Sequence, residues 1–188
     1  MRDTDEIKFI MRTTDAKICD EYKEDIPNLI VCQDRKHDAM DTFKMSLELA
    51  GDCACVNMED DIILCDDFYN KIIEEIEKRP NEVIQFFSMR KDDLTVGSRY
   101  ISGRAFCMGQ CFYIPKGMAK EVLEYMDRWT RYEEDPTALD YLFADYLKEK
   151  KIKYWNVCPN LVDHKPIKSR INPRRSTKRQ SLTFKEEK

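Results

Sequence analysis

Apolar residues along the chain recur with two different periods, which predict strands and helices in alternation. Short apolar runs typical of buried strands occupy residues 7–12, 28–33, 53–58, 82–88, 110–115 and 153–158. Apolar residues at helical spacing lie between them, over 38–50, 67–79, 118–126 and 137–150. This order predicts one α/β domain with a Rossmann-like, mainly parallel sheet flanked by helices.

Polar residues between these runs define the expected boundaries. Gly51 is placed to end the first helix, and Asp66 or Asp67 to cap the second, which Pro80 ends. The stretch 89–104 is polar and contains two glycines, so we expect a loop there.

The composition is that of a globular protein with a highly charged surface. The chain has 188 residues, enough for one domain with a hydrophobic core, and 36% of them are charged. No apolar run approaches the length of a membrane span, and the acidic N-terminus "MRDTDEIKFI" lacks a signal-peptide apolar region, so we expect a cytoplasmic protein. The eight cysteines include no C-x-x-C pair, which favours buried reduced thiols over disulfides or structural zinc.

Three adjacent carboxylates, Glu59, Asp60 and Asp61, follow the apolar run 53–58 and precede a second short apolar stretch. In open α/β sheets, ligands bind beyond the carboxyl ends of the strands. Clustered carboxylates repel one another unless they share a cation, and oxygen ligands suit Mg²⁺ or Mn²⁺, usually completed by substrate phosphates. A solvated acidic turn is the alternative, but the apolar flanks on both sides favour a metal site.

The segment "CVNMEDDIILCDDFY" resembles the metal-binding segment of GT-A-type glycosyltransferases, in which an apolar strand ends in D-x-D or E-D-D. "GQCFYIPKGMAKEVLEYM" is similar to their acceptor-side strand and helix, and "EDPTALDYLFADYLKEKKIKYWNVCPNLVDHKP" to their acidic helix, strand and late histidine. The short length and the "DHK…S-x-I-N-P" ending resemble small phage-encoded members. The resemblance implies a GT-A-like domain over 1–164 and a basic segment, 165–188, that closes over the donor site.

The resemblance implies that the donor is a nucleoside diphosphate sugar, with uracil as the expected base. Asp61 would ligate the divalent cation, Mn²⁺ or Mg²⁺, that bridges the diphosphate, and His164 would be its second protein ligand. Either histidine of the chain could instead be a surface side chain. His37 stands between charged neighbours and fits that description, whereas His164 opens the basic segment. Imidazole suits Mn²⁺ better than Mg²⁺.

The resemblance also implies that four further residues bind the donor. Glu59 and Asp60 would hold the ribose or a metal-bound water. Thr13, at the end of the first strand, and Asp34, after the second, would contact the base. The first acidic position is Glu where the commonest family pattern has Asp, and its longer reach shifts the ligand role to Asp61.

An inverting transfer needs a carboxylate that takes the acceptor proton, and the helix over 137–150 offers Asp140 and Asp145. Asp140 lies at the edge of the apolar stripe of that helix and Asp145 on its far side, beside Lys148, so Asp140 is the better candidate. Its alternative role is that of a helix N-terminal charge that complements the macrodipole. Acidic residues at 133–135 could substitute, and a retaining enzyme would need no such base.

Positive charge is concentrated at the end of the chain. The net charge is −4, yet residues 165–188 contain nine Lys or Arg and only two Glu. Lys168, and secondarily Arg170, would stabilise the charge of the departing diphosphate. The distal part, Arg174 to Arg179, is expected to serve the acceptor or no ligand. A polyanionic acceptor such as DNA would account for this surplus of cations.

The sequence thus favours a metal-dependent glycosyltransferase that moves a sugar, expected from a UDP-sugar, to an acceptor hydroxyl. The acceptor stays open among a modified DNA base, a glycan and a protein. One alternative is a non-catalytic nucleic-acid-binding protein with an acidic body and a basic tail, which explains the tail but not the carboxylates at a strand end. Another is a nucleotidyltransferase or phosphohydrolase, for which a Gly-rich phosphate loop is missing.

Overall fold

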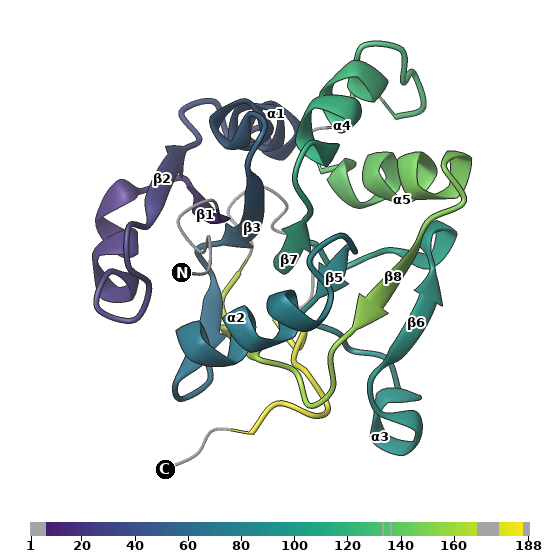
Figure 1. Ribbon diagram of the computed structural model, residues 1–188. Coiled ribbons are helices and arrows are strands. Elements are labelled where there is room, and N and C mark those ends of the chain that lie inside the picture. Colours follow the sequence, from purple (N-terminus) through teal and green to yellow (C-terminus); the bar gives the residue numbers. More distant parts are fainter. Residues whose placement is uncertain (1–6, 133, 136, 169–176, 186–188) are drawn as a thin grey trace.

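The computed structural model describes residues 7–132, 134, 135, 137–168 and 177–185. Within this part of the chain, seven strands form one sheet in the order β2-β1-β3-β7-β5-β8-β6, and two more form a small sheet, β4-β9 (Figure 1). The strands are β1 (Ile7–Thr13), β2 (Ile30–Gln33), β3 (Ala54–Glu59), β4 (Ile62–Leu64), β5 (Ile84–Gln85), β6 (Arg99–Ser102), β7 (Cys111–Ile114), β8 (Lys153–Asn156) and β9 (Val162–His164). The α-helices are α1 (Ala39–Ala50), α2 (Phe68–Lys78), α3 (Asp93–Val96), α4 (Met118–Met126) and α5 (Leu139–Glu149), and two 3₁₀ helices span Ala16–Tyr22 and Gly103–Ala105.

The α/β class with flanking helices is confirmed, but the sheet is mixed. Strands β1, β2, β3, β5 and β8 run in one direction, whereas β7 and β6 run against their neighbours. Strand β7 starts beside the carboxyl end of β3, where Cys111 pairs with Met58, and runs back toward the start of β3, where Ile114 pairs with Cys55. The expectation of a mainly parallel sheet therefore holds for the five strands that share one direction and fails for β7 and β6.

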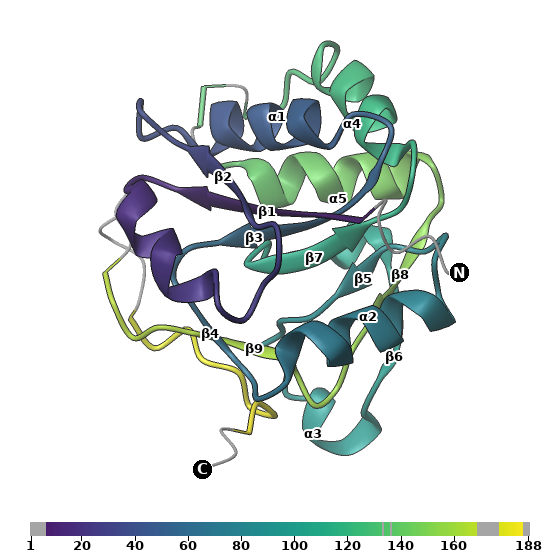
Figure 2. The ribbon, with the colours of Figure 1, turned by 60° about the vertical axis from the view of Figure 1, so that its left-hand side comes forward.

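Helices cover both faces of the sheet, with α1, α4 and α5 on one face and α2 on the other (Figure 2). Each face has its own apolar core. Phe43 of α1 and Phe143 of α5 belong to the first core, and Ile72 of α2 to the second. Apolar residues at helical spacing predict these contacts because each helix buries one stripe against the sheet.

The segment 89–104, expected as a loop, contains α3, β6 and the start of a 3₁₀ helix. These elements are three or four residues long, too short to show a period in the sequence, and β6 is fixed by its antiparallel pairing with β8. Asp67 precedes α2 as expected, but its φ is 52° and its side chain caps no backbone amide.

All eight cysteines have free thiols, and four of them are buried: Cys19, Cys32, Cys55 and Cys111. Burial raises the pKa of the Cys32 thiol to about 11, which keeps it protonated at neutral pH. No helix in the described part of the chain combines the length and the apolar character that crossing a membrane demands.

Candidate functional site

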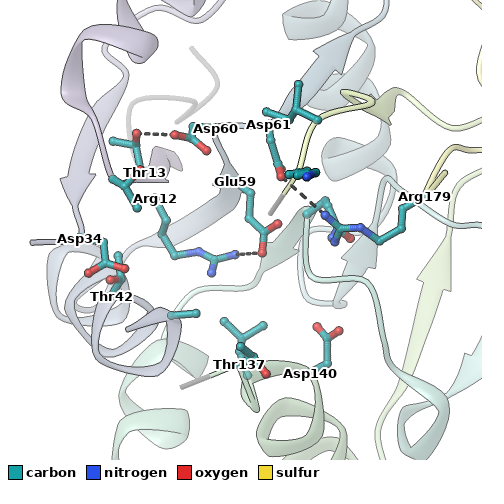
Figure 3. A pocket seen from close by; sticks show the side chains of 16 residues that line it. Arg12, Thr13, Asp34, Thr42, Glu59, Asp60, Asp61, Thr137, Asp140 and Arg179 are labelled. Carbon is teal, nitrogen blue, oxygen red and sulfur yellow. Dashed lines mark hydrogen bonds and ion pairs between the residues drawn. The ribbon is translucent and has the colours of Figure 1, made fainter. Parts of the chain in front are cut away.

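A cleft lies beyond the carboxyl ends of β1, β2 and β3, where the sequence places its acidic motif (Figure 3). It contains about 850 Å³ of empty space, part of it open to solvent. Its lining residues are Arg12, Thr13, Thr14, Asp34, Ala39, Thr42, Glu59, Asp60, Asp61, Gln110, Thr137, Leu139, Asp140, Ile167, Lys168 and Arg179. Every donor-site residue expected from the sequence lines this cleft, except His164, which is buried beside Asp61, and Arg170, which lies outside the described residues.

The small β4-β9 sheet brings Asp61 and His164 together. Asp61 directly precedes β4, and His164 ends β9 opposite Ile62. The amide of Lys165 donates to the carbonyl of Asp61 at 2.8 Å, which extends the pairing by one step. As a result, Nε2 of His164 lies 3.0 Å from Oδ2 of Asp61.

Buried polar atoms without hydrogen-bond partners concentrate at this place. Among the described residues, nine buried side-chain N and O atoms lack a partner, and five of them belong to Asp34, Asp61, Gln110 and His164. Both ring nitrogens of His164 are among the five, and the nearest acidic group to either is Oδ2 of Asp61, 3.0 Å from Nε2. Since each such atom costs roughly 1–3 kcal/mol, their concentration here indicates a ligand that would satisfy them.

The charge state of Asp61 also suits a cation. Burial on its own raises the pKa of this carboxyl, but His164 and Arg179 beside it outweigh burial and hold the pKa below its ordinary value. An ionised carboxylate next to a histidine nitrogen is a donor set that accepts Mn²⁺. No group of three or more His, Cys, Asp or Glu that could hold a metal occurs among the described residues. Asp61 and His164 are two potential protein ligands, so a cation held there would need further ligands such as phosphate oxygens and water.

The other two carboxylates of the acidic motif point to different partners. Thr13 Oγ1 donates to Oδ2 of Asp60 at 2.5 Å, and the hydroxyl of Tyr22 donates to the carbonyl of Asp60 at 2.9 Å. Glu59 lies 3.5 Å from the guanidinium of Arg12. The three adjacent carboxylates are thus divided among a hydroxyl, an arginine and a histidine, which explains how they tolerate one another.

Arg12 is a site residue that the sequence reading missed. Its side chain is buried, with Nε donating to Asn57 Oδ1 at 2.7 Å and a terminal nitrogen donating to the carbonyl of Gly109 at 2.9 Å. It therefore connects β1, β3 and the segment before β7 while it neutralises Glu59. A cation at the end of the buried run "IKFIMR" is the signal that could have revealed it.

Asp34 extends the site toward α1. Its amide donates to the carbonyl of Thr13 at 2.6 Å, which fixes the loop after β2 against the end of β1. Oδ1 accepts from the amide of Lys36 at 2.9 Å, whereas Oδ2 is buried without a partner among the described residues. Thr13 and Asp34 are thus adjacent at the cleft, and Oδ2 of Asp34 can accept a hydrogen bond from a ligand.

Asp140 faces the cleft from the first turn of α5. Its two oxygens accept hydrogen bonds from the amides of Met108 and Gly109, each at 3.0 Å. A methyl group at Gly109 would stand 2.7 Å from Leu139 Cδ2 and 3.0 Å from Asp140 Oδ1, so glycine permits this close approach. The two amides therefore hold the carboxylate in a fixed orientation. Neither the role of catalytic base nor that of a helix N-terminal charge predicts these two contacts.

Asp145 lies away from the cleft and has its own partners. Its oxygens lie 3.1 and 3.2 Å from a guanidinium nitrogen of Arg131, and the indole nitrogen of Trp129 donates to it at 3.1 Å. The sequence placed Asp145 on the solvent face near Lys148, whereas its side chain is partly buried against Arg131 and Trp129. In the preceding loop, Asp135 accepts from the amide of Thr137 at 2.9 Å. Glu133 is outside the described residues.

The basic segment reaches the cleft at two described positions. Lys168 lines it with an exposed side chain, as expected. Arg179 lines it as well, 3.9 Å from Oδ2 of Asp61 and largely buried, whereas the sequence assigned the distal part, Arg174 to Arg179, to the acceptor or to no ligand. Residues 169–176, which include Arg170, Arg174 and Arg175, lie outside the described residues.

Arg179 is held in place by contacts two to four residues further on. The amide of Ser181 donates to Asp163 Oδ1 and its hydroxyl to Asn160 Oδ1, both at 2.6 Å. Asp163 Oδ1 also accepts from the amide of His164 at 2.8 Å. Oδ1 of Asp163 thus links β9, which carries His164, to the segment that positions Arg179. Such a contact between distant segments leaves no local pattern in the sequence.

No family model and no curated protein matches this chain. Among solved structures, it is similar to the crystal structure of A197 from STIV, with a TM-score of 0.50 and 13% sequence identity. The similarity covers 84% of each chain. At this level of identity, the likeness concerns the fold alone.

Proposed function

We propose that this chain is a metal-dependent glycosyltransferase of the GT-A type, which moves a sugar from a nucleoside diphosphate to an acceptor hydroxyl. The observation that supports this most is the buried Asp61–His164 pair, with unpaired nitrogen and oxygen atoms at the edge of a cleft that two cations, Lys168 and Arg179, also face. The resemblance of "CVNMEDDIILCDDFY" to the family's metal-binding segment is independent support.

The residues of the cleft divide into a diphosphate end and a base end. Asp61 and His164 would hold the cation, which supplies charge neutralisation to the leaving diphosphate when it is bound. Lys168 and Arg179 would donate to phosphate oxygens on which negative charge grows as the sugar departs. The base end contains Asp34, whose unpaired oxygen would accept from the uracil imide.

Asp140 would take the proton from the acceptor hydroxyl in an inverting transfer. Each of its oxygens accepts one hydrogen bond from a backbone amide and retains a further lone pair for the acceptor. The two amides fix the direction of the carboxylate, so it is already oriented before the acceptor binds.

The test begins with donor chemistry, because the acceptor is not needed for it. The protein is incubated with UDP-sugars in the presence of Mn²⁺ and, separately, of EDTA, and release of UDP is measured. We expect slow metal-dependent hydrolysis of one UDP-sugar. Absence of hydrolysis and of nucleotide binding across uridine, guanosine and cytidine diphosphate sugars would refute the proposal.

A further inference from the structure

One buried side-chain oxygen at the cleft has no role in the transfer described above. Gln110 directly precedes β7, lines the cleft and is only 4% exposed. Its Oε1 is one of the buried atoms without a hydrogen-bond partner in the described part of the chain. Because an unpaired buried amide oxygen destabilises the fold, its presence at a cleft indicates a ligand that donates a hydrogen bond to it.

The backbone just before this glutamine is held by side chains from three elements. Gln85 of β5 donates to the carbonyl of Met108 at 3.1 Å, and Asp140 of α5 accepts from the amide of Met108 at 3.0 Å. Arg12 of β1 donates to the carbonyl of Gly109 at 2.9 Å. A segment fixed at these points loses little conformational freedom when a ligand binds to the side chain that follows it.

Backbone contacts place Gln110 between the acidic motif and the candidate base. Its carbonyl accepts from the amide of Glu59 at 2.8 Å, and the amide of the preceding residue, Gly109, donates to Asp140 at 3.0 Å. The side chains of Glu59 and Asp140 extend into the same part of the cleft (Figure 3). In the proposed reaction the transferred sugar lies between the diphosphate, near Asp61, and Asp140, which is where Gln110 stands.

The order of the strands separates Gln110 from the base end of the cleft. Asp34 follows β2 and Gln110 precedes β7, and β1 and β3 lie between these two strands. Three strand spacings amount to about 14 Å. A ribose and a diphosphate therefore have room between Asp34 and Gln110.

The chemistry of an amide oxygen narrows what it can bind. Oε1 of a glutamine only accepts hydrogen bonds, and ionised phosphate oxygens only accept as well, so a phosphate would leave it unpaired. A sugar hydroxyl is a donor and would satisfy it.

We propose that Gln110 binds one hydroxyl of the transferred sugar and thereby determines which UDP-hexose the protein accepts. This inference rests on the proposed glycosyl transfer and adds a residue that selects the donor sugar. A site built to bond a hydroxyl discriminates against the analogue that lacks it, because the buried oxygen is then left unpaired.

The experiment measures donor hydrolysis, which needs no acceptor, with Mn²⁺ present. UDP-glucose, UDP-galactose and UDP-N-acetylglucosamine are compared first, and each monodeoxy analogue of the best donor is then assayed with the wild type, Gln110→Met and Gln33→Met. Methionine matches glutamine in length but lacks the amide. Gln33 is the control, a half-buried glutamine that ends β2 and is not among the residues lining the cleft.

The quantity compared is the ratio of kcat/KM for the parent sugar to kcat/KM for each analogue. This ratio is taken within one protein, so it does not depend on the fraction of a variant that folds. Binding of UDP with Mn²⁺ is measured by calorimetry for the same three proteins.

We expect the wild type and Gln33→Met to prefer the parent sugar over one analogue by about tenfold or more, the usual effect of leaving a buried polar group unpaired. Gln110→Met should lose this preference, and all three proteins should bind UDP alike. A preference that Gln110→Met retains overturns the assignment. Weaker UDP binding in Gln110→Met alone also overturns it, because Gln110 would then act on the nucleotide or the cation.

Two outcomes in the wild type separate this inference from the proposed function. A wild type that hydrolyses the parent sugar and every analogue equally well overturns the role of Gln110 and leaves the glycosyl transfer standing. A wild type that neither binds UDP nor hydrolyses any of the three donors counts against the proposed function, and the role of Gln110 falls with it.

Discussion

Asp61 and Asp140 both face the cleft, but the surroundings of their oxygens differ. Each oxygen of Asp140 accepts a hydrogen bond from a backbone amide, so the fold orients this carboxylate without a ligand. Asp61 is largely buried, its Oδ1 has no hydrogen-bond partner among the described residues, and Nε2 of His164 lies 3.0 Å from its Oδ2. The comparison shows that one carboxylate is oriented by the fold, whereas the other needs an added cation to complete its contacts. Their removal should therefore damage different steps.

The largest expected effect is that of removing the Asp140 carboxylate on the rate of transfer. Asp140→Asn should leave the binding of UDP and Mn²⁺ intact and lower kcat by about 10²–10⁴-fold, the usual contribution of a positioned base. Steady-state transfer kinetics and calorimetry measure the two quantities. A drop in kcat of less than tenfold would mean that Asp140 serves only to hold the amides of Met108 and Gly109.

His164→Gln tests the candidate metal site that His164 forms with Asp61. Glutamine keeps a polar group of similar reach but is a poor ligand for a transition metal, so UDP affinity with Mn²⁺ should fall by roughly 10–100-fold, a range typical of damage to a metal site. His37→Gln is the control, since His37 is exposed and distant from Asp61 in sequence. Equal nucleotide affinity in the two variants would remove His164 from the metal site.

Arg179→Gln should reduce UDP affinity by about tenfold, the lower range for loss of a hydrogen bond to a charged group. Lys178→Gln, one residue away with an exposed side chain, should change it little. If both variants bind UDP as the wild type does, Arg179 pairs with Asp61 without contacting the donor.

Asp145→Asn should have the smallest effect. Asparagine retains the contact with Trp129 but weakens the hold on Arg131, and both lie away from the cleft, so donor hydrolysis, kcat and the KM for the acceptor should all stay close to the wild-type values. Steady-state kinetics at varied acceptor concentration measure this. A fall in kcat as large as that of Asp140→Asn would contradict the separation of the two carboxylates on α5.

The parts of the site that the sequence predicts are those with local signals. The buried run that ends in Glu59, Asp60 and Asp61 marks the edge of a sheet by itself, and the helical stripe of α5 separates Asp140 from Asp145. The pairing of β4 with β9 has no such signal, because three-residue strands show no period and their register depends on contacts across about 100 residues. His164 was found only through the family resemblance and the scarcity of histidine.

The missed residues depend on contacts between distant segments. Arg12 binds Asn57 and Gly109, and Arg179 is positioned through Ser181 by Asn160 and Asp163. The reversed direction of β7 has no local signal either, because the short elements before it look like a polar loop in the sequence. Local periodicity thus predicts the layers of the fold, while the direction of one strand and the cations of the site depend on the assembled structure.

The central claim is that a divalent cation held at Asp61 and His164 binds the nucleotide, and one titration tests it most directly. UDP is titrated calorimetrically into the wild type, Asp61→Ala and Asp66→Ala, each with Mn²⁺ and with EDTA. Asp66 is the matched control, an exposed aspartate five residues further on. We expect the wild type and Asp66→Ala to bind UDP only with Mn²⁺, and Asp61→Ala to bind it in neither condition. Equal UDP binding by the wild type and Asp61→Ala in the presence of Mn²⁺ would contradict the claim.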